Sequence, residues 1–164
     1  MNKISIRKIR KNDIDNITLL HNEFEKYLFT IDINRQSEPI EEFRTRFNRD
    51  AFSHKKHFKG FIALEGDIAV GYILFHNGYD PDEMVGPIVY IIDLFVMQEK
   101  RNMGIGKLLI DQVKQYCKSN GITLIYLYCW KKNIDAMTFY DKNNFEQIKD
   151  LAFYKVKISE IQET

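Results

Sequence analysis

Cysteine, proline and tryptophan are scarce in this chain of 164 residues, which holds two cysteines, three prolines and one tryptophan. Two cysteines outside any Cys-x-x-Cys pair, without clustered histidines, argue against a disulfide scaffold and a zinc site. We therefore expect no metal ion and a reducing, cytoplasmic location. Long apolar runs are also missing, since none approaches the roughly 18 residues that span a bilayer. The first residues lack the apolar core of a secretion signal, so we expect no membrane partner.

An excess of charge of either sign is missing as well. Lysine and arginine total 24 against 23 aspartates and glutamates, which leaves a net charge of +1. This balance gives no electrostatic reason to expect nucleic acid as a partner. The length suits one domain of about 100–200 residues. Because the chain has no internal repeat, low-complexity tract or linker, we expect residues 1–164 to form a single domain.

Hydrophobic periodicity predicts strands and helices that follow one another along the chain. Strands are expected at residues 4–9, 57–65, 68–76, 88–97, 122–128, 145–148 and 152–158. Helices are expected at residues 12–28, 37–48, 105–117 and 133–140. Gly66 and Asp67 are typical of a hairpin turn, and residues 77–87 read as a loop. Strands separated by helices predict an α/β (α+β) fold around a mixed sheet.

The most informative stretch joins the apolar strand at residues 88–97 to the next helix. Its residues are Arg101, Asn102, Met103, Gly104, Ile105 and Gly106. Glycines let a backbone approach a ligand closely, and free amides at a helix N-terminus bind phosphate. A dinucleotide fingerprint would need glycine at Leu109, and a Walker loop would need serine or threonine at Leu108. The residues alone leave two alternatives, a pyrophosphate cradle and a glycine turn without a ligand.

The Arg-x-x-Gly-x-Gly spacing after an apolar strand resembles the acetyl-CoA signature of the GCN5-related N-acetyltransferase (GNAT) family. The order of strand, loop, helix, strand and capped helix is similar to that family over nearly the whole chain. The resemblance implies a mixed, mostly antiparallel sheet of about six to seven strands flanked by about four helices. Residues 86–97, Asn133, Phe139 and Tyr140 look like the spermidine/spermine (diamine) acetyltransferase branch.

The resemblance implies transfer of an acetyl group from acetyl-CoA to a primary amine of a small molecule, a di- or polyamine or an amino-acid-like amine. A protein N-terminal or lysine acetyltransferase and a non-catalytic acyl-CoA-binding module are the alternatives. The family likeness also implies a homodimer. It places the cofactor against Phe95, Val96, Met97, Arg101, Asn102, Met103, Gly104, Ile105, Gly106, Lys107, Asn133 and Ala136.

The same likeness makes Tyr140 the general acid that protonates the leaving thiolate. Taken by itself, Tyr140 reads as a packing aromatic on the apolar stripe of its helix. Tyr27 matches a substrate-contact position of the polyamine branch, and Trp130 is either a substrate wall or a core residue. The acidic residues Asp80, Asp82 and Glu83 either attract a cationic amine or are simply solvated.

The general base is open, because Ile92 stands where the polyamine branch has a glutamate. Alternation along a strand puts Ile92 and Asp93 on opposite faces, so we expect Asp93 to be a buried structural acid. A water relay, Tyr90, Tyr128 and His76 are the candidates that accept the proton. The acceptor end is thus expected to include Tyr27, Ile92 and Tyr128.

Overall fold

The structure is a computed structural model that describes residues 3–80, 86–152 and 154. Its strands are β1 (Ile4–Lys8), β2 (Lys59–Glu65), β3 (Ile68–Asp80), β4 (Gly86–Val96) and β5 (Leu124–Leu127). Its helices are α1 (Ile14–Ile31), α2 (Ile40–Phe52), α3 (Ile105–Ser119) and α4 (Ile134–Lys142). Two short 3-10 turns, Lys11–Asp13 and Gln98–Lys100, precede α1 and α3.

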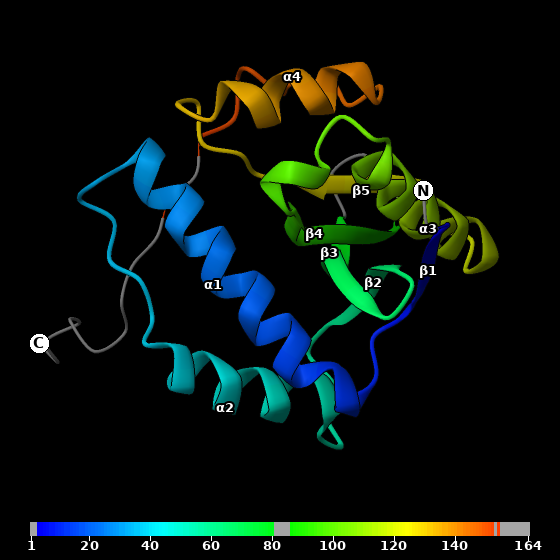
Figure 1. The fold of residues 1–164 in the computed structure, drawn as a ribbon. Helices are drawn as coiled ribbons and strands as arrows, with labels where there is room; N and C mark the ends of the chain where they lie inside the picture. The colour runs from blue at the N-terminus through cyan, green and yellow to red at the C-terminus, as the bar shows by residue number, and fades with distance from the viewer. Residues whose placement is uncertain (1–2, 81–85, 153, 155–164) are drawn as a thin grey trace, which may run out of the picture.

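The five strands form one mixed sheet in chain order (Figure 1). Neighbours from β1 to β4 are antiparallel, and β5 is parallel to β4. This arrangement confirms the predicted α/β class with a mixed, mostly antiparallel sheet. The β2–β3 hairpin turns at Gly66 as predicted, and the φ of 62° at this residue favours glycine because it has no Cβ to clash.

The apolar faces of the helices pack on both sides of the sheet. Helices α1 and α2 cover one side, where Ile17, Leu20, Phe43 and Phe47 are buried. Helix α3 covers the other side through its own buried stripe. Burying each such side chain contributes about 1.5–3 kcal/mol, so the helices are held firmly against the sheet. Parts of β4, α1 and α4, which are far apart in the sequence, are thereby held around one cavity.

The predicted strand at residues 145–148 does not form. Instead, Asn144 adopts a left-handed conformation with a φ of 63°, and the Phe145 N–H bonds to the Tyr140 carbonyl. This is the usual way in which a helix end satisfies its last carbonyls. The Phe145 ring then packs on Tyr140 at 5.5 Å between ring centroids. The apolar residue that suggested a strand is therefore used to close α4. Most of the strand predicted at residues 152–158 lies outside the described residues.

Other boundaries differ from the sequence analysis by a few residues, most of all in β3 and α2. Strand β3 continues to Asp80, because its pairing with β4 extends as far as Gly86, whereas the loop was expected from residue 77. The second helix starts at Ile40, after Pro39, and ends at Phe52, a few residues later than predicted at both ends. Pro39 favours this start because its fixed φ suits the entry to a helix and it has no N–H to leave unpaired.

Candidate active site

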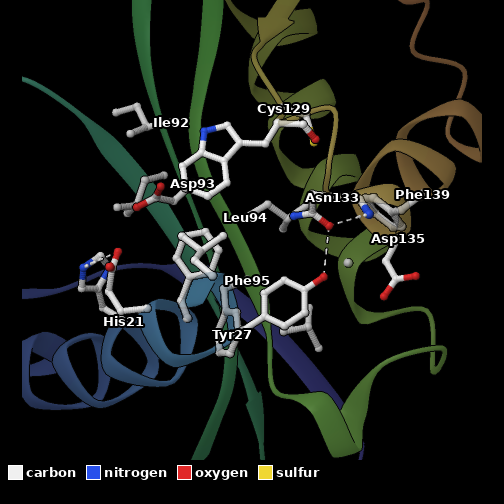
Figure 2. A pocket seen from close by; sticks show the side chains of 18 of the residues that line it. His21, Tyr27, Ile92, Asp93, Leu94, Phe95, Cys129, Asn133, Asp135 and Phe139 are labelled. Carbon is white, nitrogen blue, oxygen red and sulfur yellow. Dashed lines mark hydrogen bonds and ion pairs between the residues drawn. The ribbon is translucent and has the colours of Figure 1, made fainter. Parts of the chain in front are cut away.

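A cavity of about 1060 Å³ lies between α1, α2, the carboxyl half of β4, the start of α3 and α4. Ligand pockets usually measure about 300–1,000 Å³, so this one has room for a large cofactor together with a small acceptor. Figure 2 shows residues of α1 and β4 facing Asn133 and Phe139 across this space. The cavity has two ends, one at the glycines before α3 and one at Asp93.

The first end is built from the loop that leads into α3. Gly104 adopts a left-handed conformation with a φ of 80°, and its carbonyl accepts the first helical bond, from the Leu108 N–H. In the described chain, the backbone amides of residues 102–107 donate to no backbone carbonyl. An ideal Cβ at Gly104 would meet no atom within 4 Å, whereas one at Gly106 would lie 3.0 Å from the Phe139 ring. The loop thus offers unpaired donors in open space, which is what a phosphate cradle needs.

Strands β4 and β5 separate beside the cavity, which leaves further backbone donors and acceptors of β4 unpaired. Strand β5 pairs with β4 only along Ile88 to Ile91, although β4 continues to Val96. Beyond that point, the edge of β4 that faces away from β3 has no paired strand in the described part of the chain. Phe95 and Val96 line the cavity there.

Arg101 and Tyr27 brace this end of the cavity. The Arg101 Nε donates to the Val96 carbonyl at 3.1 Å, and its guanidinium lies over the Tyr27 ring at 4.1 Å. The Tyr27 hydroxyl donates to Asn133 Oδ1 at 3.0 Å, as the dashed line in Figure 2 shows. The same oxygen accepts from the Ala136 N–H at 3.1 Å, so Asn133 caps α4 as predicted. Tyr27, expected among the substrate contacts, therefore ties α1 to the start of α4.

Most of the residues expected to hold the cofactor line this cavity. They are Phe95, Val96, Arg101, Asn102, Gly104, Ile105, Gly106, Lys107, Asn133 and Ala136. Met97 and Met103 are not among the lining residues. The Met97 N–H is already bonded to the Val70 carbonyl at 3.0 Å, and Met103 is an exposed side chain.

The prediction that Ile92 and Asp93 face opposite sides of the sheet is wrong. In the pairing of β4 with β3, Asp93 lies opposite Leu74 and Ile91 opposite Phe75, so Ile92 is an extra residue with no partner. This is a β-bulge, which breaks the alternation of side chains. Ile92 packs against the apolar cluster under α1 and α2, and both Ile92 and Asp93 line the cavity.

Asp93 consequently points into the cavity, as Figure 2 shows. Among the described residues, no donor hydrogen-bonds to its carboxylate and no cation lies within ion-pair distance. Burial at the bottom of the cavity, and then the nearby charge of Glu25, raise the pKa of Asp93 from 3.8 to about 6, while Arg46 and Arg35 act in the opposite direction. A carboxyl group with a pKa near neutrality and no structural partner is suited to proton transfer. The expected structural role of Asp93 is therefore not supported.

Tyr140 lies on α4 and lines the same cavity. Burial, followed by the charges of Cys129 and Asp93, raises the pKa of its phenol. Its ring contacts Phe139 and Phe145, each at 5.5 Å between centroids. Both roles considered for this residue fit its surroundings, since the ring packs against its neighbours while the side chain borders the cavity. The raised pKa keeps the phenol protonated at neutral pH.

The other candidate bases divide between two places. His76 and Tyr90 stack on each other at 5.7 Å and do not line the cavity. Tyr128, which is 60% exposed, does line it. Asp80 accepts a hydrogen bond from the Tyr126 hydroxyl at 2.9 Å and is not part of the lining. Asp82 and Glu83 lie outside the described residues.

The sequence analysis missed the charged residues of the acceptor end. Glu25 on α1, Arg35 after α1 and Arg46 on α2 all line the cavity near Asp93. Glu25 is 8% exposed, and its position among the apolar residues of the α1 stripe could have signalled it. Trp130 also lines the cavity, with the Arg35 guanidinium over its ring at 5.0 Å.

Within the described ranges, no cluster of three or more His, Cys, Asp or Glu side chains could hold a metal ion. None of the helices in that part of the chain is long and apolar enough to cross a membrane.

Comparison with known proteins places this site in a family. The sequence model of the acetyltransferase (GNAT) family matches residues 18–145. The chain is 28% identical over 170 residues to N-alpha-acetyltransferase 60 of Danio rerio, which covers 94% of this chain and 64% of that protein. It is 24% identical over 145 residues to thialysine N-epsilon-acetyltransferase of Bos taurus, in an alignment that covers 84% of this chain and 81% of that protein. The chain thus spans somewhat less than two thirds of the first of these relatives.

Solved structures agree on the fold. An integron cassette protein of V. cholerae superposes with a TM-score of 0.79 at 19% identity, covering 94% of this chain and 92% of that one. The aminoglycoside N-acetyltransferase AAC(6')-Iy in complex with CoA superposes with a TM-score of 0.76 at 18% identity, and the superposition covers 96% of this chain and 97% of that one. Because the family model matches well over half of the chain, this protein belongs to the acetyltransferase (GNAT) family.

Proposed function

We propose that this protein transfers the acetyl group of acetyl-CoA to the primary amine of a small molecule, with Asp93 as general base and Tyr140 as general acid. The observation that carries the proposal is the single cavity that joins the unpaired amides before α3 to Asp93 and Tyr140. A binding site for a phosphate-bearing cofactor and two groups able to move protons thus share one space.

In this proposal the cofactor lies along the first end of the cavity. The amides of residues 102–107 bind the pyrophosphate, and the unpaired edge of β4 near Phe95 and Val96 binds the pantetheine arm. Asn133 and Ala136 border the other side. The residues fit such a group because the loop holds open space and unpaired donors together. When bound, acetyl-CoA supplies a thioester carbonyl as the electrophile.

The acceptor must first lose a proton. An alkylamine with a pKa near 10.4 is almost entirely an ammonium ion at neutral pH and has no free electron pair. With its pKa raised to about 6, Asp93 is ionised at pH 7 and can take that proton, either directly or through one water molecule. The amine nitrogen then forms a bond to the carbonyl carbon, and the carbon–sulfur bond breaks.

The leaving thiolate must next be neutralised. Tyr140 holds its proton at every working pH because burial raises the pKa of the phenol. A phenol is a weaker acid than a thiol in solution, so it donates only when it is positioned at the sulfur as charge develops there. In this proposal Tyr140, which lies on α4 and lines the same cavity, is that donor. Asp93 thus takes one proton from the ammonium group and Tyr140 gives one to the sulfur. The nitrogen loses its second proton as the amide forms, and that proton returns to the Tyr140 phenolate, directly or through water.

A small amine is favoured over a protein acceptor by the charged acceptor end and by the likeness to thialysine N-epsilon-acetyltransferase. The diamine branch has weaker support, because Ile92 replaces its glutamate. The likeness to N-alpha-acetyltransferase 60 favours protein N-termini as the second candidate. A homodimer and a cytoplasmic location, expected from the family resemblance and from the two free cysteines, complete the proposal.

The test is the release of free thiol from acetyl-CoA, measured over a panel of diamines, amino acids and peptides with free N-termini. We expect release that depends on a small amine. Tight binding of acetyl-CoA without release for any acceptor would identify a non-catalytic binding module. Release with peptides alone would move the assignment to protein N-termini. Light scattering during size-exclusion chromatography measures the oligomeric state.

A further inference from the structure

The acceptor end of the cavity carries two arginine–glutamate pairs. Arg35 donates to both carboxylate oxygens of Glu25, from Nε at 3.0 Å and from Nη2 at 2.8 Å. Arg46 donates to Glu38 in the same two-point manner, from Nε at 2.8 Å and from Nη2 at 2.6 Å. All four residues line the cavity. Each glutamate charge is therefore already matched by an arginine.

Among the acids that line the acceptor end, the pairing leaves Asp93 for an amine, whereas Asp135 lies at the start of α4 beside Asn133. Asp50, a further acid of the lining, is held by Arg49 at 2.6 Å. Asp93 alone among these acids has no cation within ion-pair distance in the described chain. A diamine or polyamine would bring a second ammonium group to an end of the cavity where Glu25, Glu38 and Asp50 already pair with arginines. Like charges in such a space repel each other.

The arginines still have unused donors. A guanidinium carries five N–H groups, and the bonds to a glutamate occupy only the Nε and one Nη2 hydrogen. Nη1 of Arg35 and Nη1 of Arg46 donate to no residue in the described ranges. Arg35 is also held against the Trp130 ring at 5.0 Å, so its position is fixed before a ligand arrives. A fixed planar guanidinium is well suited to bind a carboxylate.

We propose that the acceptor amine carries a carboxylate, which Arg35 binds with help from Arg46, while Asp93 takes the ammonium group that is acetylated. This inference rests on the proposed function and names its substrate class. The carboxylate belongs either to a free amino acid or to the C-terminus of a short peptide. In both cases the ammonium that is acetylated pairs with Asp93, and the carboxylate accepts from the arginine N–H groups that the glutamates leave unused.

The experiment compares acceptors that differ only in their carboxylate. Thiol release is measured for lysine against cadaverine, ornithine against putrescine, and β-alanine against ethylamine. We expect kcat/KM to be about 10–100-fold higher with the carboxylate, the effect of a charge-assisted contact of this type. The dipeptide glycyl-lysine against its C-terminal amide shows whether a peptide carboxylate serves as well. Faster turnover of the carboxylate-free partners would overturn the inference and leave the proposed acetyl transfer intact.

The variant Arg35→Gln tests the residue. It removes the carboxylate contact and frees Glu25, so the preference for lysine over cadaverine should fall to about one or reverse. The matched control is Arg44→Gln, which removes the same charge from α2 at an exposed pair with Asp15, outside this cavity. The control should keep the wild-type preference. An unchanged preference in Arg35→Gln, with turnover of both amines retained, contradicts the role given to Arg35. Absence of turnover with every amine in the wild type would instead reject the proposed function itself.

Discussion

Replacing Asp93 by asparagine should make the protein more stable at pH 8 and nearly inactive. The carboxyl pKa is raised from 3.8 to about 6, chiefly by burial. An acid whose pKa is raised on folding stabilises the native state below its unfolded pKa, and this contribution is lost as the pH rises through the folded pKa. At about 1.4 kcal/mol per pH unit, ionised Asp93 costs about 3 kcal/mol at pH 8. Because Asp93 borders a cavity that is open to solvent, part of that charge is screened, and we expect about 2 kcal/mol.

The asparagine side chain has nearly the same shape and no charge, so Asp93→Asn should recover that free energy. Urea unfolding measured from pH 4 to pH 8 should show the variant more stable by about 2 kcal/mol at pH 8, with the difference vanishing near pH 4. Over the same range, kcat/KM of the wild type should rise with an apparent pKa near 6. In Asp93→Asn this rise should disappear, and kcat/KM should be about a hundredfold or more lower.

The matched control is Asp50→Asn, which alters another cavity acid. Its ion pair with Arg49 lowers the pKa of Asp50, so the control should bring no gain in stability and should keep the pH profile. An Asp93→Asn variant that is less stable than the wild type at pH 8 would show that the carboxylate has a stabilising partner. A pH profile unchanged by the substitution would place the general base elsewhere.

Three further outcomes are expected. Tyr140→Phe should preserve the ring contacts with Phe139 and Phe145 and hence the melting temperature, but lower kcat about a hundredfold or more; an unchanged kcat would reject the general acid. Gly104→Asp should abolish acetyl-CoA binding in calorimetry by placing a carboxylate against phosphate, whereas Gly104→Asn, of equal size and tolerant of a positive φ, should retain much of it. Burial lowers the pKa of His21 from 6.5 to about 4. Neutral His21 therefore contributes about 3 kcal/mol to the free energy of unfolding above pH 6.5, and this contribution is lost as the pH falls to 4. This pH dependence should be missing in His21→Gln, and its persistence would assign it to other groups.

Local features of the site could be predicted from the sequence because short segments determine them. The glycines before α3, the Asn133 cap and the Gly66 turn each depend on a few adjacent residues. The start of α3 follows from Gly104 and the apolar stripe behind it. Such features need no knowledge of what packs against them.

The acceptor end could not be predicted in the same way, because it is assembled from distant segments. Glu25 and Arg35 come from α1 and the loop after it, whereas Trp130 follows β5. Periodicity assigns charged residues on helices to solvated faces, and only the packing of α1 and α2 against the sheet turns these side chains inward. Tyr27 was linked to the substrate by resemblance, yet its hydroxyl bonds to Asn133, more than a hundred positions away.

The bulge at Ile92 brings a carboxylate to the cavity although an isoleucine stands where the polyamine branch has a glutamate. Regular alternation would have kept Ile92 at the cavity and turned Asp93 to the α3 side of the sheet. One unpaired residue opposite Leu74 and Phe75 instead leaves both side chains on the cavity side. Ile92 packs against the apolar cluster under α1 and α2, and Asp93 provides the carboxylate. In the proposed mechanism the proton acceptor is therefore shifted by one residue, and Asp93 is the acid without an ion pair at the acceptor end, as the proposed amino-acid-like acceptor requires.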